Sequence, residues 1–353
     1  MTTATVKGNV LCYKGSNFFR QRLVLSVLSG KPIRISYIRA FEDEPGIKEF
    51  EVSLIRLFDK ITNGSVIELN ETGTSLYFQP GLLHGGTFSH ECSTQRGVGY
   101  YLEALVMVGL FCKQPLNATL HGVTNNNIDP SADLIKTSMI RAVKNFVLDD
   151  EGLEIKVTKR GMLPLGGGEV IFKCPVRKQL RPVQLLDSGM VKRIRGTAFA
   201  LRVSPAIANR IVDKAKGVLL NFLPDVYINT DQCRAEQVSN VVSNGEDPSI
   251  PEDVGEGAAT RLLYEIYLGG VVDSSSQALV ILCMALGQQD VSKFVTGPLT
   301  ENAIGFLRHL KEFFGVTFKV AHESDEDSSG RGTQKVVLTC VGIGYKNISK
   351  RTI

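Results

Sequence analysis

The order of helical and strand-like segments is the feature that most constrains what this chain can fold into. An apolar helix pattern at 17–29 is followed by an alternating strand at 33–37, an amphipathic helix at 51–61 and two short strands. The same order recurs between residues 99 and 175, and again between 276 and 340. The pattern therefore predicts an α+β protein in which stacked units share one architecture.

Residues 185–273 follow a different pattern. Ser204 followed by a proline is a typical helix start, and Pro224 would end that helix. A strand and a second helix complete the segment. We therefore predict a small inserted α/β domain at 185–273, within a large domain formed by residues 1–184 and 274–353.

Cysteine and hydrophobic patterns exclude several classes of protein. The seven cysteines include no Cys-x-x-Cys pair and lie in apolar runs, which is typical of reduced thiols in a cytosolic or nuclear protein. The most apolar stretch, 99–112, is too short for a membrane span and carries Glu103. The five histidines show no metal-ligand spacing. We expect no secretion, no membrane insertion, no metal and no cofactor.

Basic residues concentrate between Lys156 and Arg195. This segment holds ten Lys and Arg against two acidic residues, a local excess of +8 in a chain whose net charge is +4. It could contact RNA, meet an acidic protein surface or simply solvate strand edges. No aromatic residue interrupts the run 192–195. The candidates for contact with RNA or a partner are Lys192, Arg193, Arg195, Arg177 and Lys178.

Two loops could bind a phosphate. Gly166-Gly167-Gly168 has no following Lys-Ser or Lys-Thr and precedes a strand, so we predict a tight turn there and not a nucleotide loop. The acidic run 325–327, with Arg331 and Lys335, could hold Mg²⁺ and a scissile phosphate as nucleases do. The alternative for this Ser/Gly-rich run is a solvated loop without function.

Several short phrases stand in order along the chain: Leu28–Ile35, Ile38-Arg39-Ala40, Pro45-Gly46-Ile47, Gly122–Asn125 and Pro164–Gly168. Together these phrases resemble the RNA 3′-terminal phosphate cyclase superfamily. The resemblance covers nearly the whole chain and implies three βαβαββ-type units in a large domain, with a small α/β domain inserted before the third. The family's small domain is longer than this chain between Asn229 and Val238.

The chain departs from this family at the catalytic positions. Active cyclases attack ATP with a histidine four residues before an asparagine; counted from Asn302, that position is Pro298, which offers no nucleophile. The family's Gly- and Glu-containing loop aligns with 12–17, which has lost the Glu and two glycines. Arg20 and Arg39 are retained and are candidates for binding an anion. The resemblance implies that cyclase activity is absent and that no catalytic residue remains.

The departures are similar to those of the cyclase-like branch found in eukaryotic nucleoli. Similarity to that branch implies that the protein is a ribosome-biogenesis factor of the small-subunit processome. It would be located in the nucleus and nucleolus and needed for early pre-rRNA processing. Its expected partners are a ribosome-assembly GTPase and pre-rRNA. The protein itself is expected to be a monomer before it forms this complex. Two alternatives stay open: a metal-dependent endonuclease using either Asp327, Arg331 and Lys335 or the Arg20/Arg39 pocket, and a cyclase with a substitute nucleophile.

Overall fold

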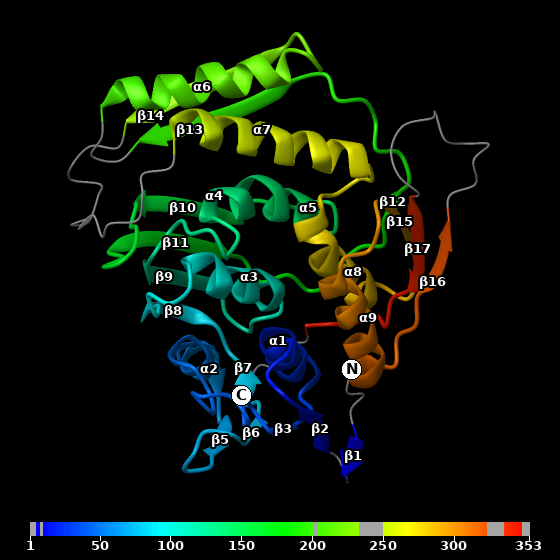
Figure 1. Ribbon diagram of the computed structural model, residues 1–353. Helices are drawn as coiled ribbons and strands as arrows, with labels where there is room; N and C mark the ends of the chain where they lie inside the picture. Colours follow the sequence, from blue (N-terminus) through cyan, green and yellow to red (C-terminus); the bar gives the residue numbers. More distant parts are fainter. Residues whose placement is uncertain (1–4, 8–9, 201–203, 233–249, 323–334, 348–353) are drawn as a thin grey trace.

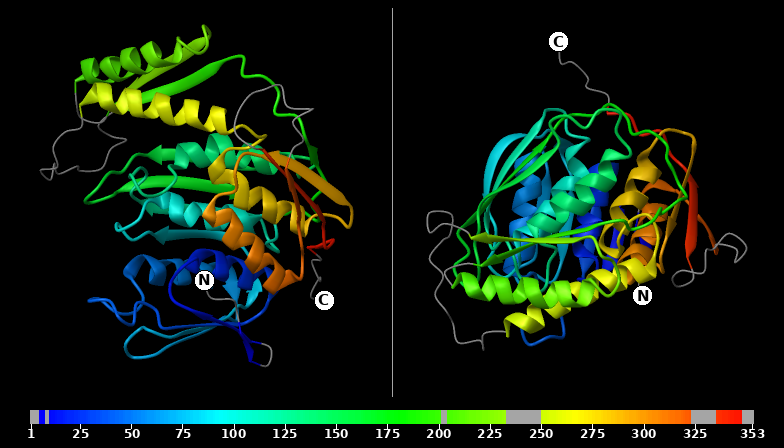
Figure 2. Two further views of the ribbon diagram at one scale, coloured as in Figure 1. Left: turned by 45° about the vertical axis from the view of Figure 1, so that its right-hand side comes forward. Right: turned by 90° about the horizontal axis from the view of Figure 1, so that it is seen from above.

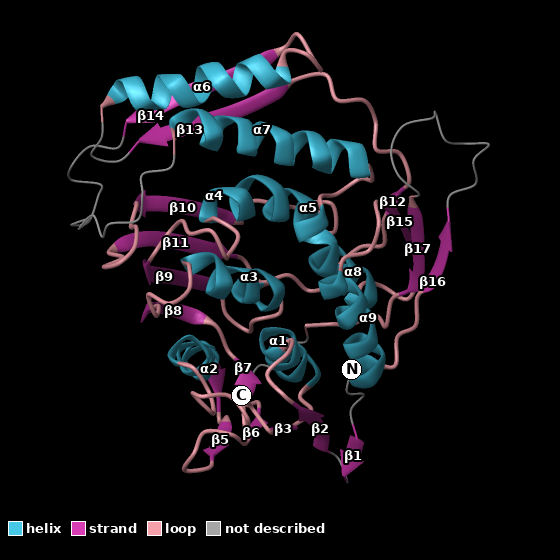
Figure 3. Cartoon of the chain, viewed as in Figure 1, coloured by secondary structure: helices cyan, strands magenta, loops and turns pink. Residues whose placement is uncertain are grey.

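The computed structural model describes residues 5–7, 10–200, 204–232, 250–322 and 335–347. The chain has a mixed α and β fold. Among the described residues there are three sheets of four or five strands, which lie at the bottom, left and right of Figure 1 with helices between them. Figure 3 shows the same arrangement by type of element.

The first sheet has the order β1-β2-β3-β6-β5. Helix α1 connects the parallel strands β2 and β3, and α2 leads to the antiparallel pair β5 and β6. Ile33 and Ile35 of β3 are buried while Arg34 between them is exposed, as expected for a sheet with one face on the core. The elements are β1 (Thr5–Lys7), β2 (Val10–Lys14), α1 (Phe19–Ser29), β3 (Ile33–Ser36), α2 (Glu49–Ile61), β5 (Val66–Leu69) and β6 (Leu76–Gln79), with the short pair β4 (Thr62–Asn63) and β7 (Leu82–Leu83).

The second and third sheets have the orders β8-β9-β11-β10 and β12-β15-β17-β16. In each, the first two strands are parallel and the other two join antiparallel, which is the connectivity of β2, β3, β6 and β5. The second sheet uses β8 (Gly86–Glu91), α3 (Val98–Gly109), β9 (Leu116–Gly122), α4 (Ala132–Leu134), a π-helical turn (Ile135–Met139), α5 (Ile140–Lys144), β10 (Glu154–Lys159) and β11 (Gly168–Cys174). The third uses β12 (Gln184–Leu185), a 3₁₀ turn (Ser274–Ser276), α8 (Gln277–Leu286), β15 (Val291–Thr296), α9 (Glu301–Phe314), β16 (Lys319–His322) and β17 (Val336–Val341).

One hydrophobic core joins the three sheets. It lies where the helices gather between the sheets, as the view from above shows (Figure 2, right). Every residue of α3 and of α8 is buried, so both helices are apolar all round and pack against neighbours on all sides. This explains the apolar stretch at 99–112, and no helix among the described residues is long and apolar enough to cross a bilayer.

A separate small core lies above the large one in Figure 1. Its elements are β13 (Ile194–Ala200), α6 (Pro205–Leu219), β14 (Val226–Gln232) and α7 (Pro251–Leu268). β13 and β14 form a two-stranded parallel sheet, and the core consists of Ile194, Ala215, Leu219 and Ala259 with partly buried neighbours. We call this group of four elements the small unit.

Most helices predicted from periodicity are confirmed, including α1, α2, α6 and α9, with ends within a few residues. Six strands were missed, namely β1, β2, β4, β7, β8 and β12, and β13 was expected only around residues 192–195. The predicted boundary at 184/185 falls inside β12, where Leu185 pairs with Phe294 of the third sheet, so the small unit begins after Leu185. The expected shortening between Asn229 and Val238 lies mostly outside the described residues.

The triple glycine is a tight turn, as predicted. Gly166 and Gly167 have φ angles of 69° and 76°, which favour glycine, and Gly168 begins β11. A β-carbon on Gly168 would lie 2.6 Å from the backbone nitrogen of Gly161 and 2.8 Å from the carbonyl oxygen of Gly122. The backbones therefore pack too closely for a side chain, which explains these glycines without a bound phosphate.

We predict that Gly168→Ala destabilises the protein because its β-carbon must displace neighbouring backbone, at a cost of about 1–3 kcal/mol. Thermal unfolding followed by circular dichroism should show a lower Tm. The matched control is Gly217→Ala on exposed α6, where a β-carbon meets nothing within 4 Å and the helix is expected to gain stability. Equal Tm values for the two variants would contradict the close packing of this turn.

Candidate functional site

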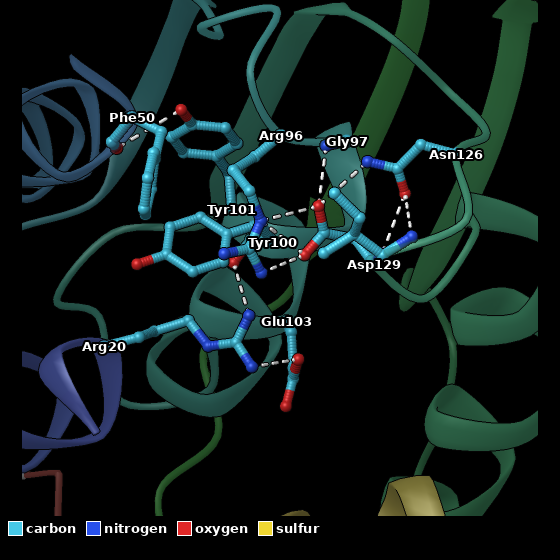
Figure 4. A network of polar contacts seen from close by, with 10 residues as sticks. Arg20, Phe50, Arg96, Gly97, Tyr100, Tyr101, Glu103, Asn126 and Asp129 are labelled. Atoms are coloured by element: carbon cyan, nitrogen blue, oxygen red, sulfur yellow. Dashed lines mark hydrogen bonds and ion pairs between the residues drawn. The ribbon is translucent and has the colours of Figure 1, made fainter. Parts of the chain in front are cut away.

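The retained Arg20 lies on α1 and points toward α3. Its Nη2 is 2.5 Å from a carboxylate oxygen of Glu103, and its Nη1 donates to the carbonyl oxygen of Tyr100 at 3.1 Å. Figure 4 shows the guanidinium clasped between these two groups. The Glu103 side chain is only 5% exposed, and burial raises its pKa against the opposing attraction of Arg20. Arg20 is therefore already engaged by a buried acidic partner.

The retained Arg39 lies after β3, with a left-handed φ of 44°. Its guanidinium donates two hydrogen bonds to Glu51, at 2.7 and 2.8 Å, and a third to the carbonyl oxygen of Gly46 at 3.0 Å. Glu51 is 2% exposed and also accepts the backbone N–H of Lys48, which caps α2. The hydrogen bonds to Glu51 raise the pKa of Arg39. Arg39 thus fastens the Pro45-Gly46 turn to the start of α2.

A third pair, Arg96 with Asp129, was not anticipated from the sequence. Nε of Arg96 lies 2.9 and 3.0 Å from the two Asp129 oxygens, and the backbone N–H of Gly97 donates to the same carboxylate at 2.8 Å. Asn126 adds a further hydrogen bond at 3.1 Å (Figure 4). Burial works to raise the pKa of Asp129, but the hydrogen bonds from Arg96, Asn126 and Gly97 together hold it below its usual value.

We call these three pairs, Arg20–Glu103, Arg39–Glu51 and Arg96–Asp129, the arginine–carboxylate network. Arg20 and Arg96 are joined through the Tyr100 ring, whose centroid lies 4.8 and 4.5 Å from the two guanidinium carbons. Phe50 contacts Tyr100 edge-on at 5.5 Å. Contacts of a cation with an aromatic face are stabilising, so the rings hold the guanidiniums in place.

A cleft of about 520 Å³ opens beside this network. It is lined by residues 44–50 at the start of α2, together with Gln95, Arg96 and Ile128. Glu44 and Glu49 contribute negative charge, and Arg96 is neutralised by Asp129. The exposed acidic residues Glu42 and Asp43 lie just before it in the chain. The cleft has no excess of positive charge to attract a polyphosphate.

Pro298, which is expected to correspond to the family's nucleophilic histidine, lies in the loop between β15 and α9. Its ring is exposed, and its carbonyl oxygen accepts a hydrogen bond from Gln277 Nε2 at 3.0 Å. His309, farther along α9, is buried instead. Its Nδ1 lies 3.0 Å from Gln21 Oε1, and the ring packs edge-on against Tyr13 and Phe18. Burial, reinforced by Arg22 and Arg308, lowers its pKa to about 3, so His309 stays neutral within the core.

Of the three residues proposed for nuclease chemistry, only Lys335 is among the described residues. Asp327 and Arg331 lie outside the described residues. Lys335 directly precedes β17, and its stem lies so close to Gly269 that a β-carbon there would be 3.1 Å from Lys335 Cε. Among the residues with described positions, no three His, Cys, Asp or Glu side chains form a group that could hold a metal ion.

The basic candidates lie in two places. Arg177 and Lys178 are at the edge of the large core, where Arg177 donates to the Glu151 carbonyl oxygen at 2.9 Å and the Lys178 carbonyl accepts from the backbone of Asn347. Lys192, Arg193 and Arg195 lead into and along β13 in the small unit. β14 supplies the aromatic residue that the run itself lacks, because Tyr227 pairs with Arg195 across the sheet. Sequence reasoning missed this because the two residues are 32 positions apart.

Comparison with known proteins gives a consistent result. Residues 11–320 match the family described as RNA 3′-terminal phosphate cyclase. A Drosophila melanogaster protein named probable RNA 3′-terminal phosphate cyclase-like protein is 55% identical, covering 98% of both chains. The Homo sapiens RNA 3′-terminal phosphate cyclase-like protein is 51% identical over 96% of this chain and 97% of its own length. A Schizosaccharomyces pombe relative, 41% identical over 98% and 99% of the two chains, is named rRNA processing protein rcl1.

We predict that Asp129→Ala destabilises the fold by about 3–5 kcal/mol, because it leaves the Arg96 guanidinium without its buried partner. Chemical denaturation measures the change. Asp150→Ala is the matched control, since Asp150 forms an exposed ion pair with Lys144 and its loss should shift the midpoint little. Similar midpoint shifts in the two variants would contradict the structural role of the network.

We also predict that the stability of the wild type and that of Asp129→Ala depend differently on pH. Because the folded-state pKa of Asp129 is lowered, its contribution to stability is present above the unfolded pKa of about 3.9 and is lost as pH falls through the folded value. Between pH 5 and pH 2 the wild type should therefore lose more stability than Asp129→Ala does. Parallel losses in the two proteins would show that Asp129 does not contribute in this way.

Proposed function

Because the chain belongs to the RNA 3′-terminal phosphate cyclase family, we propose that it acts in ribosomal RNA processing as a family member without cyclase activity. The rRNA-processing part is supported by the printed name of the Schizosaccharomyces pombe relative, which aligns over nearly its full length. The names of the animal relatives, which call them cyclase-like, agree with a member that differs from the enzymes.

The loss of cyclase activity is carried by Pro298. Covalent nucleotidyl transfer needs a side chain with an available electron pair, and a proline ring within a peptide bond has none. The arginine–carboxylate network supports the same conclusion. Arg20 and Arg39 each already neutralise a buried carboxylate, so ATP would have to compete with Glu103 and Glu51 for them. Removing a guanidinium from such a partner is costly, since it leaves a buried charge unpaired.

The finer role follows from the resemblance. We propose a nucleolar and nuclear factor of the small-subunit processome, which binds a ribosome-assembly GTPase and positions pre-rRNA near it. If it favours one nucleotide state of the GTPase, it must bind that state more tightly, as linkage requires.

The shared connectivity of the three sheets supports three copies of one βαβαββ unit, and the separate core of the small unit supports an inserted domain ending at residue 273.

Complementation in cells tests the processing role. After depletion of the endogenous protein, we expect precursors of the small-subunit rRNA to accumulate on northern blots. Wild type and Pro298→Ala should restore processing equally, because the position does no chemistry. The GTPase should copurify with both. Normal processing after depletion would contradict the proposed role, and failure of Pro298→Ala at wild-type protein levels would contradict a non-catalytic Pro298.

Chemistry on the purified protein separates an assembly factor from the two enzymes. With Mg²⁺ and ATP, intact-mass spectrometry should find no adenylylated protein; an adduct would reveal a substitute nucleophile. With Mg²⁺ and a pre-rRNA fragment, gel analysis should find the RNA uncut. Specific cleavage that is lost in Asp327→Ala or Lys335→Ala would establish the endonuclease alternative and overturn the non-enzymatic proposal.

A further inference from the structure

The two-stranded sheet of the small unit has one face on its helices and one face turned away from them. Ile194 and Ala198 of β13 are buried toward the helices, together with partly buried Val226 and Ile228 of β14. The alternate residues therefore point the other way. The register pairs them in rows across the sheet: Arg195 with Tyr227, Thr197 with Asn229, and Phe199 with Asp231. We call this the outer face of the small unit.

Tyr227 is the exposed ring of this face. Tyr227 is 57% exposed and is the second residue of β14, in a sheet of two strands. The guanidinium carbon of Arg193 lies 5.7 Å from the ring centroid, and Arg193 is held there by an ion pair with Asp225 at 2.7 Å. Arg195 is exposed, and within the described part of the chain no carboxylate lies within ion-pair distance of it. The face thus combines an exposed aromatic ring on β14 with two arginines of the neighbouring segment 193–195, one of which is in an exposed ion pair with Asp225.

Phe199 of the outer face contacts the large core. The guanidinium carbon of Arg160 lies 4.2 Å from the ring centroid of Phe199, at the far end of β13. Arg160 directly follows β10, whose last residue, Lys159, is exposed. The +8 segment supplies positive charge at the Lys192–Arg195 end of the face, whereas Asp231, which pairs with Phe199, places a carboxylate at the other end. The positive charge of the face is thus concentrated beside Tyr227.

This combination matches the requirements of single-stranded RNA. Proteins bind single strands with a basic surface that follows the phosphates and with aromatic rings on which unpaired bases stack. Sheet surfaces with exposed aromatic residues serve this purpose in known RNA-binding domains. Duplex RNA keeps its bases stacked inside, so it has no base face to offer Tyr227. An acidic protein surface would use the arginines but gain little from an exposed ring among polar residues such as Thr197 and Asn229.

We propose that the outer face of the small unit binds single-stranded RNA, with one base stacked on Tyr227 and the adjoining phosphates beside Arg193 and Arg195. The inference rests on the proposed function insofar as pre-rRNA is the expected source of the strand. Thr197 and Asn229, both exposed on the same face, offer hydrogen-bonding groups to the stacked or neighbouring nucleotide.

The test is fluorescence anisotropy with the full-length protein and a labelled ten-nucleotide single-stranded RNA of mixed sequence. Tyr227→Ala should weaken binding about 5- to 150-fold, the range expected for loss of one base–aromatic stack. Tyr227→Phe should bind as the wild type does, because it keeps the ring. The matched control is Tyr264→Ala, which removes an equally exposed tyrosine, 58% against 57%, from α7 of the same unit.

A second pair of variants tests the charge. Arg195→Glu should weaken binding and reduce the slope of log affinity against log salt by about 0.7 or more, the effect of losing one phosphate contact on a single strand. Arg261→Glu, an exposed arginine on α7, changes the net charge equally and should leave the slope unchanged. A blunt-ended duplex of the same sequence should bind more weakly than the single strand.

Three outcomes would overturn the inference: no binding of the single strand, equal losses in Tyr227→Ala and Tyr264→Ala, or tighter binding of the duplex. Failure here is distinguishable from failure of the proposed function. If Tyr227→Ala and Arg195→Glu bind RNA as the wild type does while depletion still blocks rRNA processing, the role in processing stands and this RNA surface is wrong. Each variant must first show the same Tm as the wild type, so that a folding defect is not mistaken for a loss of RNA binding.

Discussion

The pairing of buried arginines with buried carboxylates is the interaction on which this account depends. Arg20 with Glu103 ties α1 to α3, and Arg39 with Glu51 ties the turn after β3 to α2. Arg96 with Asp129 ties the start of α3 to the loop after β9. Each carboxylate is almost fully buried, so removal of either partner would leave an unpaired charge in the core. The Arg20–Glu103 pair therefore joins helices that belong to the first and second sheets, while the other two pairs each fix a turn or loop within one of these units.

The same arginine–carboxylate pairs bear on whether a similar sequence implies a similar activity. From the sequence, Arg20 and Arg39 are expected to match arginines of active cyclases and are candidates for an anion site. In the structure, each guanidinium is paired with a buried carboxylate, and the adjoining cleft carries Glu44, Glu49 and Lys48 on its wall. These pairs stabilise the fold, and together with Pro298 they support the proposed loss of cyclase activity. The new outer surface, at Tyr227, lies in a different part of the molecule.

Local periodicity predicted much of the fold, because a helix such as α9 or a half-buried strand such as β3 leaves its pattern in consecutive residues. The missed strands β2 and β8 show no alternation of apolar and polar residues in their sequences, Val-Leu-Cys-Tyr-Lys and Gly-Thr-Phe-Ser-His-Glu. Contacts between residues that are far apart in the sequence could not be predicted. Nothing near Arg96 in the sequence indicates that Asp129 is its partner, and nothing in the run ending at Arg195 shows that Tyr227 will lie opposite it. The tight turn at Gly166 was predictable, since the residues after it rule out a nucleotide loop.

Titration calorimetry with Mg²⁺ and ATP tests the central claim most directly, because it measures whether the retained arginines can still accept a polyphosphate. We predict no binding heat at millimolar ATP, for the wild type and for Arg39→Ala alike, since Glu103 and Glu51 already hold the guanidiniums. Saturable binding by the wild type that disappears in Arg39→Ala would show that the site still receives nucleotide, and would contradict the account.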